Sequence, residues 1–204
     1  MNHIFIKKGH DIRIAGIPSK DVVSIPGSDT VAISPKTFRG VKPKRMVSEG
    51  DRVQIGSPLF FDKTKPEVKW ASPANGTVQT IQFGARHVIE KIEIKIEGTD
   101  SISGQTFLME QLESADHQTI LNRILEANLF PLIRQRPFNK VANPKDSPRD
   151  IFISAVNTAP LSVDLESVLE SEKAAFQAGV TALSKLTDGS VVVTSKKAME
   201  LQHA

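Results

Sequence analysis

The chain has 204 residues, of which 39% are hydrophobic and 24% charged, a balance typical of folded globular proteins with room for two modest domains. The formal net charge is only +3, and acidic residues lie between the basic ones, so we expect no nucleic-acid partner. The absence of cysteine excludes disulfides, thiolate zinc sites, cysteine-ligated iron–sulfur clusters and a cysteine nucleophile. Because no apolar run approaches the about 20 residues of a membrane helix, and the start carries no signal-peptide core, we expect a cytoplasmic protein.

Residues 1–32 contain short apolar runs that are interrupted by Gly9, Gly16 and Pro18. Breakers at this spacing favour one or two short strands over a helix. The sequence therefore predicts an N-terminal extension with short strands over residues 1–32.

Residues 33–98 repeat a pattern of turn, short strand and turn. The first copy is Glu49-Gly50-Asp51-Arg52-Val53 followed by Gly56, and the second follows Ser72-Pro73 as Gly76-Thr77-Val78. Apolar residues then alternate with charged ones up to Ile96, as in a half-buried strand. We predict a small, folded-over β domain of the barrel-sandwich hybrid (lipoyl-like) type over 33–98.

Residues 99–130 are expected to hold a polar linker and a helix. Between Phe107 and Leu129 the apolar period becomes helical, and Ser114 or Asp116 is a candidate N-cap.

Residues 131–204 are predicted to form a Rossmann-like α/β domain that is cut short. The turn signals of Asn139–Arg149 indicate a loop. The apolar runs Ile151–Val156 and Val191–Thr194 are typical of parallel strands buried on both faces, with a crossover helix over Ser171–Leu186. Such a unit needs further strands, so we expect the chain to be part of a longer protein.

Common catalytic and metal motifs are missing from the sequence. The five histidines include no i, i+4 pair, and neither a Walker-type loop nor a Gly-x-Ser-x-Gly elbow occurs. The basic run Arg39–Arg45 is interrupted by Pro43 and is interpreted as a solvated loop.

Lys65 offers one hypothesis for chemistry. Domains that carry biotin or lipoate are acylated on a lysine at a hairpin tip. Lys65 lies eight residues before Pro73, about where such a lysine is expected. However, Pro66 follows it, and neither Met-Lys-Met nor Asp-Lys-Ala is present. A carrier module modified on Lys65 remains the alternative to an unmodified structural module.

A second hypothesis concerns Arg134, Arg136 and Phe138. Guanidinium groups pair with oxyanions and stack on rings, so these residues are candidates for contact with an anionic or planar group, and the alternative is a rigid connector with solvated arginines.

The chain resembles the A-subunit family of the bacterial Na+-translocating NADH:quinone oxidoreductases. The resemblance is strongest in the block Arg134-Gln135-Arg136-Pro137-Phe138-Asn139-Lys140-Val141, and it extends to Lys7-Lys8-Gly9, Glu49-Gly50-Asp51, Pro58-Leu59-Phe60, Ile151-Phe152-Ile153 and Leu186-Thr187-Asp188-Gly189.

The resemblance implies a peripheral subunit on the cytoplasmic side of the bacterial inner membrane. The complex couples NADH oxidation and ubiquinone reduction to Na+ export, other subunits carry the flavins and the iron–sulfur cluster, and membrane contact runs through those partners. Arg134, Arg136 and Phe138 become candidates for contact with quinone or a neighbouring subunit.

The resemblance also implies that this chain binds no redox cofactor and has no catalytic or metal-ligating residue of its own. Related flavin-bearing subunits have a glycine-rich phosphate loop where this chain has Leu132–Phe138. No glycine occurs between Gly104 and Gly179, and backbone amides cannot crowd a phosphate without glycine.

Overall fold

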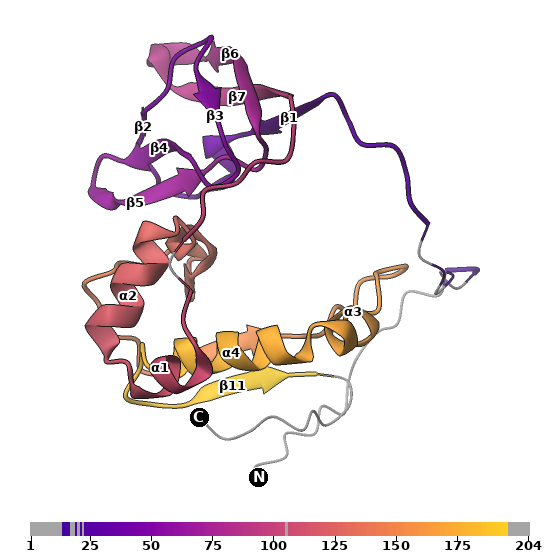
Figure 1. The fold of residues 1–204 in the computed structure, drawn as a ribbon, viewed down its shortest axis with the longest axis vertical. Coiled ribbons are helices and arrows are strands. Elements are labelled where there is room, and N and C mark those ends of the chain that lie inside the picture. The colour runs from indigo at the N-terminus through magenta and orange to yellow at the C-terminus, as the bar shows by residue number, and fades with distance from the viewer. Residues whose placement is uncertain (1–13, 17–18, 20, 22, 105, 196–204) are drawn as a thin grey trace.

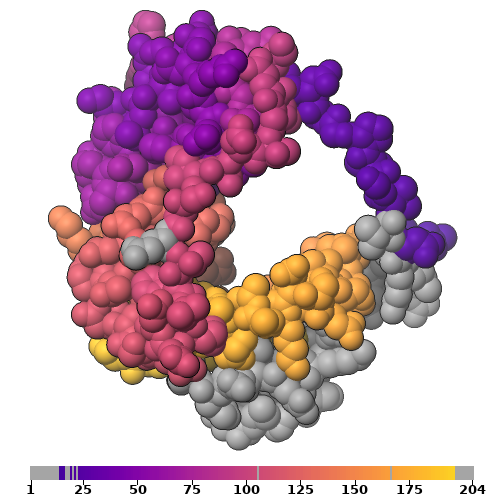
Figure 2. All heavy atoms as spheres, in the orientation of Figure 1, coloured from indigo at the N-terminus to yellow at the C-terminus, as the bar shows by residue number. Residues whose placement is uncertain are grey.

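The computed structural model describes residues 14–16, 19, 21, 23–104 and 106–195 (Figure 1). Of the N-terminal extension predicted over residues 1–32, residues 1–13, 17–18, 20 and 22 lie outside the described residues, and the described residues before Thr30 form no strand. Figure 2 shows two lobes, which we call the β lobe (residues 30–97) and the α/β lobe (residues 106–195). They meet where strand β5 (Lys65–Ala71) packs against helix α2 (His117–Glu126) and the short 3-10 turn η3 (Phe130–Leu132).

The β lobe consists of two antiparallel sheets and two 3-10 turns, η1 and η2. The larger sheet has the order β1-β7-β6-β3 and the smaller one β2-β4-β5. The bounds are β1 Thr30–Ile33, η1 Pro35–Thr37, β2 Pro43–Arg45, β3 Arg52–Val53, β4 Pro58–Asp62, β5 Lys65–Ala71, β6 Gly76–Phe83, η2 Ala85–His87 and β7 Ile89–Ile96. Strand β1 thus begins three residues before residue 33, the predicted start of the β domain.

The core of the β lobe is built from apolar residues of both sheets. Leu59, Phe60, Val68 and Trp70 come from the smaller sheet and Val78, Ile92 and Ile94 from the larger one, and none is more than 3% exposed. The rings of Phe60 and Trp70 stack with centroids 4.9 Å apart. The period-two pattern at Val68 and Trp70 and at Ile92 and Ile94 contributes to two facing apolar layers. In β4 the consecutive residues Leu59 and Phe60 are both buried, next to a shift in the register with β5.

The Glu49-Gly50-Asp51 motif fastens the first turn to β6. The Gly50 amide donates to the Val78 carbonyl at 2.8 Å, and the Val78 amide donates to the Asp51 carbonyl at 2.9 Å. The Glu49 carboxylate accepts from the Ile81 amide at 2.7 Å. The motif is thus a structural device that closes the sheet.

Two helices, not one, follow the linker. Helix α1 (Met109–Ser114) and helix α2 (His117–Glu126) are separated at Ala115 and Asp116. Asp116 is the N-cap of α2, since its carboxylate accepts from the Thr119 amide at 2.8 Å. The helix expected with an N-cap at Ser114 or Asp116 is thus α2, capped by Asp116, whereas the short helix α1 was not expected as a separate element.

A short β-hairpin occupies the segment after α2. The 3-10 turn η3 (Phe130–Leu132) precedes the hairpin, which consists of β8 (Arg134–Gln135) and β9 (Lys140–Val141) with a cis Arg136–Pro137 bond between the two strands. The expectation that Asn139–Arg149 is a loop throughout was wrong at its start, because Lys140 and Val141 pair with β8.

The α/β lobe contains the expected pair of parallel strands. Strand β10 (Ile151–Ser154) and strand β11 (Val191–Thr194) pair in parallel, and helices α3 (Leu165–Ser171) and α4 (Lys173–Ser184) lie between them in the chain. The expectation of burial on both faces was wrong: Phe152 is 68% exposed and Val192 is 41% exposed. One face packs toward α4, and the other faces outward.

Candidate functional site

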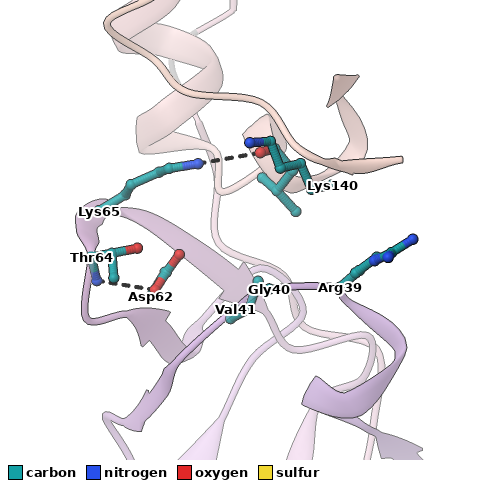
Figure 3. A pocket seen from close by; sticks show the side chains of 8 residues that line it. Arg39, Gly40, Val41, Asp62, Thr64, Lys65 and Lys140 are labelled. Atoms are coloured by element: carbon teal, nitrogen blue, oxygen red, sulfur yellow. Dashed lines mark hydrogen bonds between the residues drawn. The ribbon is translucent and has the colours of Figure 1, made fainter. Parts of the chain in front are cut away.

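Lys65 joins the two lobes. It begins β5, and its Nζ donates to the backbone carbonyls of Val141 at 3.2 Å and Ala142 at 3.1 Å (Figure 3). Nearby, the Asn128 side-chain amide donates to the Gly56 carbonyl at 3.0 Å. These contacts attach the hairpin and the end of α2 to the β lobe.

A cleft of about 220 Å³ lies at this junction, and we call it the junction cleft. Its lining comes from both lobes and consists of Arg39, Gly40, Val41, Asp62, Thr64, Lys65, Lys140 and Val141. Figure 3 shows the Lys65 side chain extending across the cleft toward β9, whereas the Arg39 side chain points away from it.

Asp62 is the one buried carboxylate of the cleft lining, at 4% exposure. Its Oδ1 accepts hydrogen bonds from the amides of Lys42 at 3.2 Å and Thr64 at 3.0 Å. It therefore holds the β4–β5 turn and compensates part of the positive charge of the cleft lining.

The hairpin separates the three residues that sequence analysis grouped. Arg134 is half-buried, and its Cζ lies 5.0 Å from the centroid of the Phe38 ring of the β lobe. Arg136 and Phe138 are exposed, Phe138 at 62%. Arg134 thus belongs to the lobe junction, whereas Arg136 and Phe138 face outward.

Sequence reasoning missed that Arg39 and Lys140 line the junction cleft. It also missed the contact of Lys65 with the other lobe. Arg39 was assigned to a solvated loop over Arg39–Arg45, and it is exposed and borders the junction cleft. The loop expectation was wrong for Pro43–Arg45, which form β2 and pair with β4. The partners of Lys65 are backbone carbonyls 76 and 77 residues away along the chain, and no local pattern encodes such a contact.

Among the described residues, no group of three or more histidine, aspartate or glutamate side chains is placed to hold a metal ion. Within the same residues no helix is long and apolar enough to cross a membrane.

Comparison with protein families gives two matches. Residues 4–97 match the N-terminal barrel-sandwich hybrid domain of NqrA, and residues 115–204 match the second alpha/beta domain of NqrA. Both parts of the predicted fold class, a barrel-sandwich hybrid domain and an α/β domain, are thereby confirmed.

Curated relatives agree with these matches. The chain is 37% identical over 190 residues to proteins from Yersinia pseudotuberculosis serotype O:1b (strain IP 31758) and Klebsiella pneumoniae (strain 342), and 34% identical over 183 residues to one from Pseudomonas aeruginosa (strain UCBPP-PA14). Each is named as the A subunit of a Na(+)-translocating NADH-quinone reductase. The matches cover 90–93% of this chain and 41–42% of each relative. The chain therefore belongs to the NqrA family, the A subunits of the Na+-translocating NADH-quinone reductases, and carries its N-terminal and second domains.

Proposed function

We propose that this chain serves as the N-terminal part of an A subunit in a complex that oxidises NADH, reduces ubiquinone and exports Na+. The observation that carries the proposal is the match of both lobes, in order, to the two NqrA domains. The subunit is peripheral, on the cytoplasmic side of the bacterial inner membrane, and other subunits of the complex provide its membrane contact.

In this proposal the chain binds neither flavin nor an iron–sulfur cluster. The Leu132 amide donates to the Leu129 carbonyl and the Ile133 amide to the Phe130 carbonyl, both at 3.0 Å. These amides are therefore engaged within the η3 turn, and Pro137 has no amide hydrogen to offer. A phosphate at this loop would find few backbone donors, which supports placing the redox cofactors on other subunits.

The hairpin tip is the proposed contact with quinone or a neighbouring subunit. Arg136 and Phe138 present an exposed cation and an exposed ring on adjacent parts of one hairpin. Guanidinium and aromatic groups are enriched at protein interfaces and also stack on planar ligands. Arg134 connects the hairpin to the β lobe through its contact with Phe38.

The test replaces Arg134 and Arg136 together by Ala in the intact complex. We expect weaker complex assembly or slower quinone reduction. The single Arg136→Ala variant separates the roles, because Arg136 is exposed whereas Arg134 also packs against the β lobe. A raised KM for quinone in an assembled complex indicates quinone contact, and loss of assembly indicates contact with a neighbouring subunit.

The matched control replaces Arg52 and Arg149 together by Ala, since both are exposed arginines outside the hairpin. It should leave assembly and quinone reduction unchanged. Unchanged assembly and quinone reduction in the Arg134/Arg136 double variant would contradict the role given to the hairpin.

The alternative, a biotin or lipoate carrier modified on Lys65, makes a different demand on that side chain. A carrier lysine must be accessible to a ligase, whereas the Lys65 Nζ is occupied by two backbone carbonyls of the other lobe. This contact favours the unmodified module. Intact-mass measurement after co-expression with a biotin or lipoate ligase tests it, and a mass increase matching either group would reinstate the alternative.

A further inference from the structure

One face of the β10–β11 sheet has exposed apolar side chains. Phe152 and Val192 are direct partners in the parallel register and are both exposed. Because strand residues alternate between faces, Ser154 and Thr194 lie on the same side. We call these four residues the outer face. It offers an aromatic ring and a valine flanked by small hydroxyl side chains, and none of the four is charged.

The opposite face is already covered. Helix α4 lies alongside β11 (Figure 1), and its Val180 and Thr181 are buried. Ile151 of β10 packs against the hydrophobic core on that side. Parallel sheets occur almost only with layers on both faces, since their strands carry apolar side chains on both sides. Within the described residues, no element supplies a second layer over the outer face of this sheet.

The length of the relatives indicates what supplies this layer. The matched portion is 42% of the Yersinia protein, and the matched domains are the N-terminal and the second one, so the remaining length of that relative follows them. An uncharged face with a central aromatic ring suits the apolar stripe of a helix. One helix, about 10 Å across, is wide enough to cover two strands about 4.8 Å apart.

We infer that the outer face is the docking surface for a helix from the polypeptide that follows the second α/β domain in full-length relatives. The helix sets its apolar stripe on Phe152 and Val192 and completes a three-layer arrangement of helix, sheet and helix. The inference rests on family membership and does not depend on the role proposed for the chain in the NADH-oxidising complex.

The test uses the absence of native cysteine, which allows a single engineered thiol to report on one site. Ser154→Cys on the outer face is labelled with a maleimide in two proteins: the 204-residue chain, and the same chain joined after Ala204 to the C-terminal remainder of the Yersinia relative. We expect rapid labelling in the short chain and labelling slower by about tenfold or more in the joined chain, since a covered thiol reacts only through local opening.

Controls isolate the outer face. A thiol at exposed Gln82 of β6 should react equally fast in both proteins. Adding Phe152→Ala to the joined chain should restore labelling of the thiol at position 154 by roughly tenfold, because a large buried apolar contact is lost. Phe83→Ala, which removes an exposed ring from β6, should not restore it.

Two results overturn the inference. The first is rapid labelling of the thiol at position 154 in a joined chain that unfolds cooperatively. The second is protection in the short chain alone that rises with protein concentration, which would assign the face to a second copy of the chain. If the joined chain does not unfold cooperatively, the C-terminal remainder is co-expressed with the tagged short chain. The C-terminal remainder should then copurify with the tagged short chain of native sequence, and it should not copurify with the Phe152→Asp variant. Failure of the remainder to copurify with the native short chain also overturns the inference.

Discussion

Gly76 is the position at which a single added methyl group should damage the β lobe most. A Cβ built on Gly76 would lie 1.8 Å from the Lys95 carbonyl oxygen and 2.9 Å from its carbonyl carbon, and Gly76 has φ of +157°. Gly76 pairs with Ile96 of β7 on one side and Val53 of β3 on the other. Because the obstacle is backbone in a neighbouring strand, relief requires the strands to separate.

The expected cost of Gly76→Ala follows from two contributions. The unfavourable backbone conformation costs an alanine about 1–3 kcal/mol. Overpacking against neighbouring backbone costs about another 1–3 kcal/mol. The sum is about 4 kcal/mol, a large share of the about 5–15 kcal/mol by which domains are stable. At a slope of about 2 kcal/mol per M, the urea midpoint falls by about 2 M.

Trp70 makes this measurement specific to the β lobe. It is the only tryptophan, it is 3% exposed, and it stacks on Phe60 in the core. Its fluorescence therefore follows unfolding of that lobe. The matched control is Gly104→Ala, where an added Cβ meets nothing within 4 Å. If Gly76→Ala and Gly104→Ala unfold at the same urea concentration, the steric argument is refuted.

The remaining predictions concern the lobe junction and the α2 cap. Lys65→Met should weaken the junction, because two hydrogen bonds from a charged donor, worth about 1.5–3 kcal/mol each, are lost. Limited proteolysis between the lobes should therefore become faster. The control Lys63→Met, at an exposed residue of the β4–β5 turn, should leave the proteolysis rate unchanged. Asp116→Ala should lower the thermal midpoint at neutral pH. The hydrogen bonds from Thr119 are the main cause that holds the pKa of Asp116 below its ordinary value of 3.8, so the carboxylate stabilises the fold above that value and the stabilisation is lost as the pH falls through the lower folded-state pKa. The difference between native protein and Asp116→Ala should therefore vanish in acid; a difference that persists unchanged at about pH 2 would contradict this account.

Local sequence was sufficient to predict the β lobe, because its determinants act over a few residues. Glycines at 50 and 76 mark turns and close approaches, and alternating apolar residues such as Ile92 and Ile94 define the buried face of a strand. The N-cap of α2 was narrowed to two candidates by residue type alone, since only a short polar side chain can accept from the first turn.

The candidate site was predicted only in part, for a physical reason. The sequence identified Arg134, Arg136 and Phe138 as a group, but their environments depend on the hairpin and on Phe38, which is 96 positions away from Arg134 in the chain. The hairpin itself has only two residues in each strand, too few for a periodic signal.

By itself, the sequence determined most strands of the β lobe, the helix α2, the parallel strands β10 and β11 with the helix α4 and, through its resemblance, the family. Only the tertiary structure decided that Lys65 spans the lobe junction and that Phe152 faces outward. Both outcomes depend on which surfaces meet across the molecule. A lysine and an apolar strand residue carry the same local propensities whether or not a partner covers them, so packing between distant segments decides what each of them does.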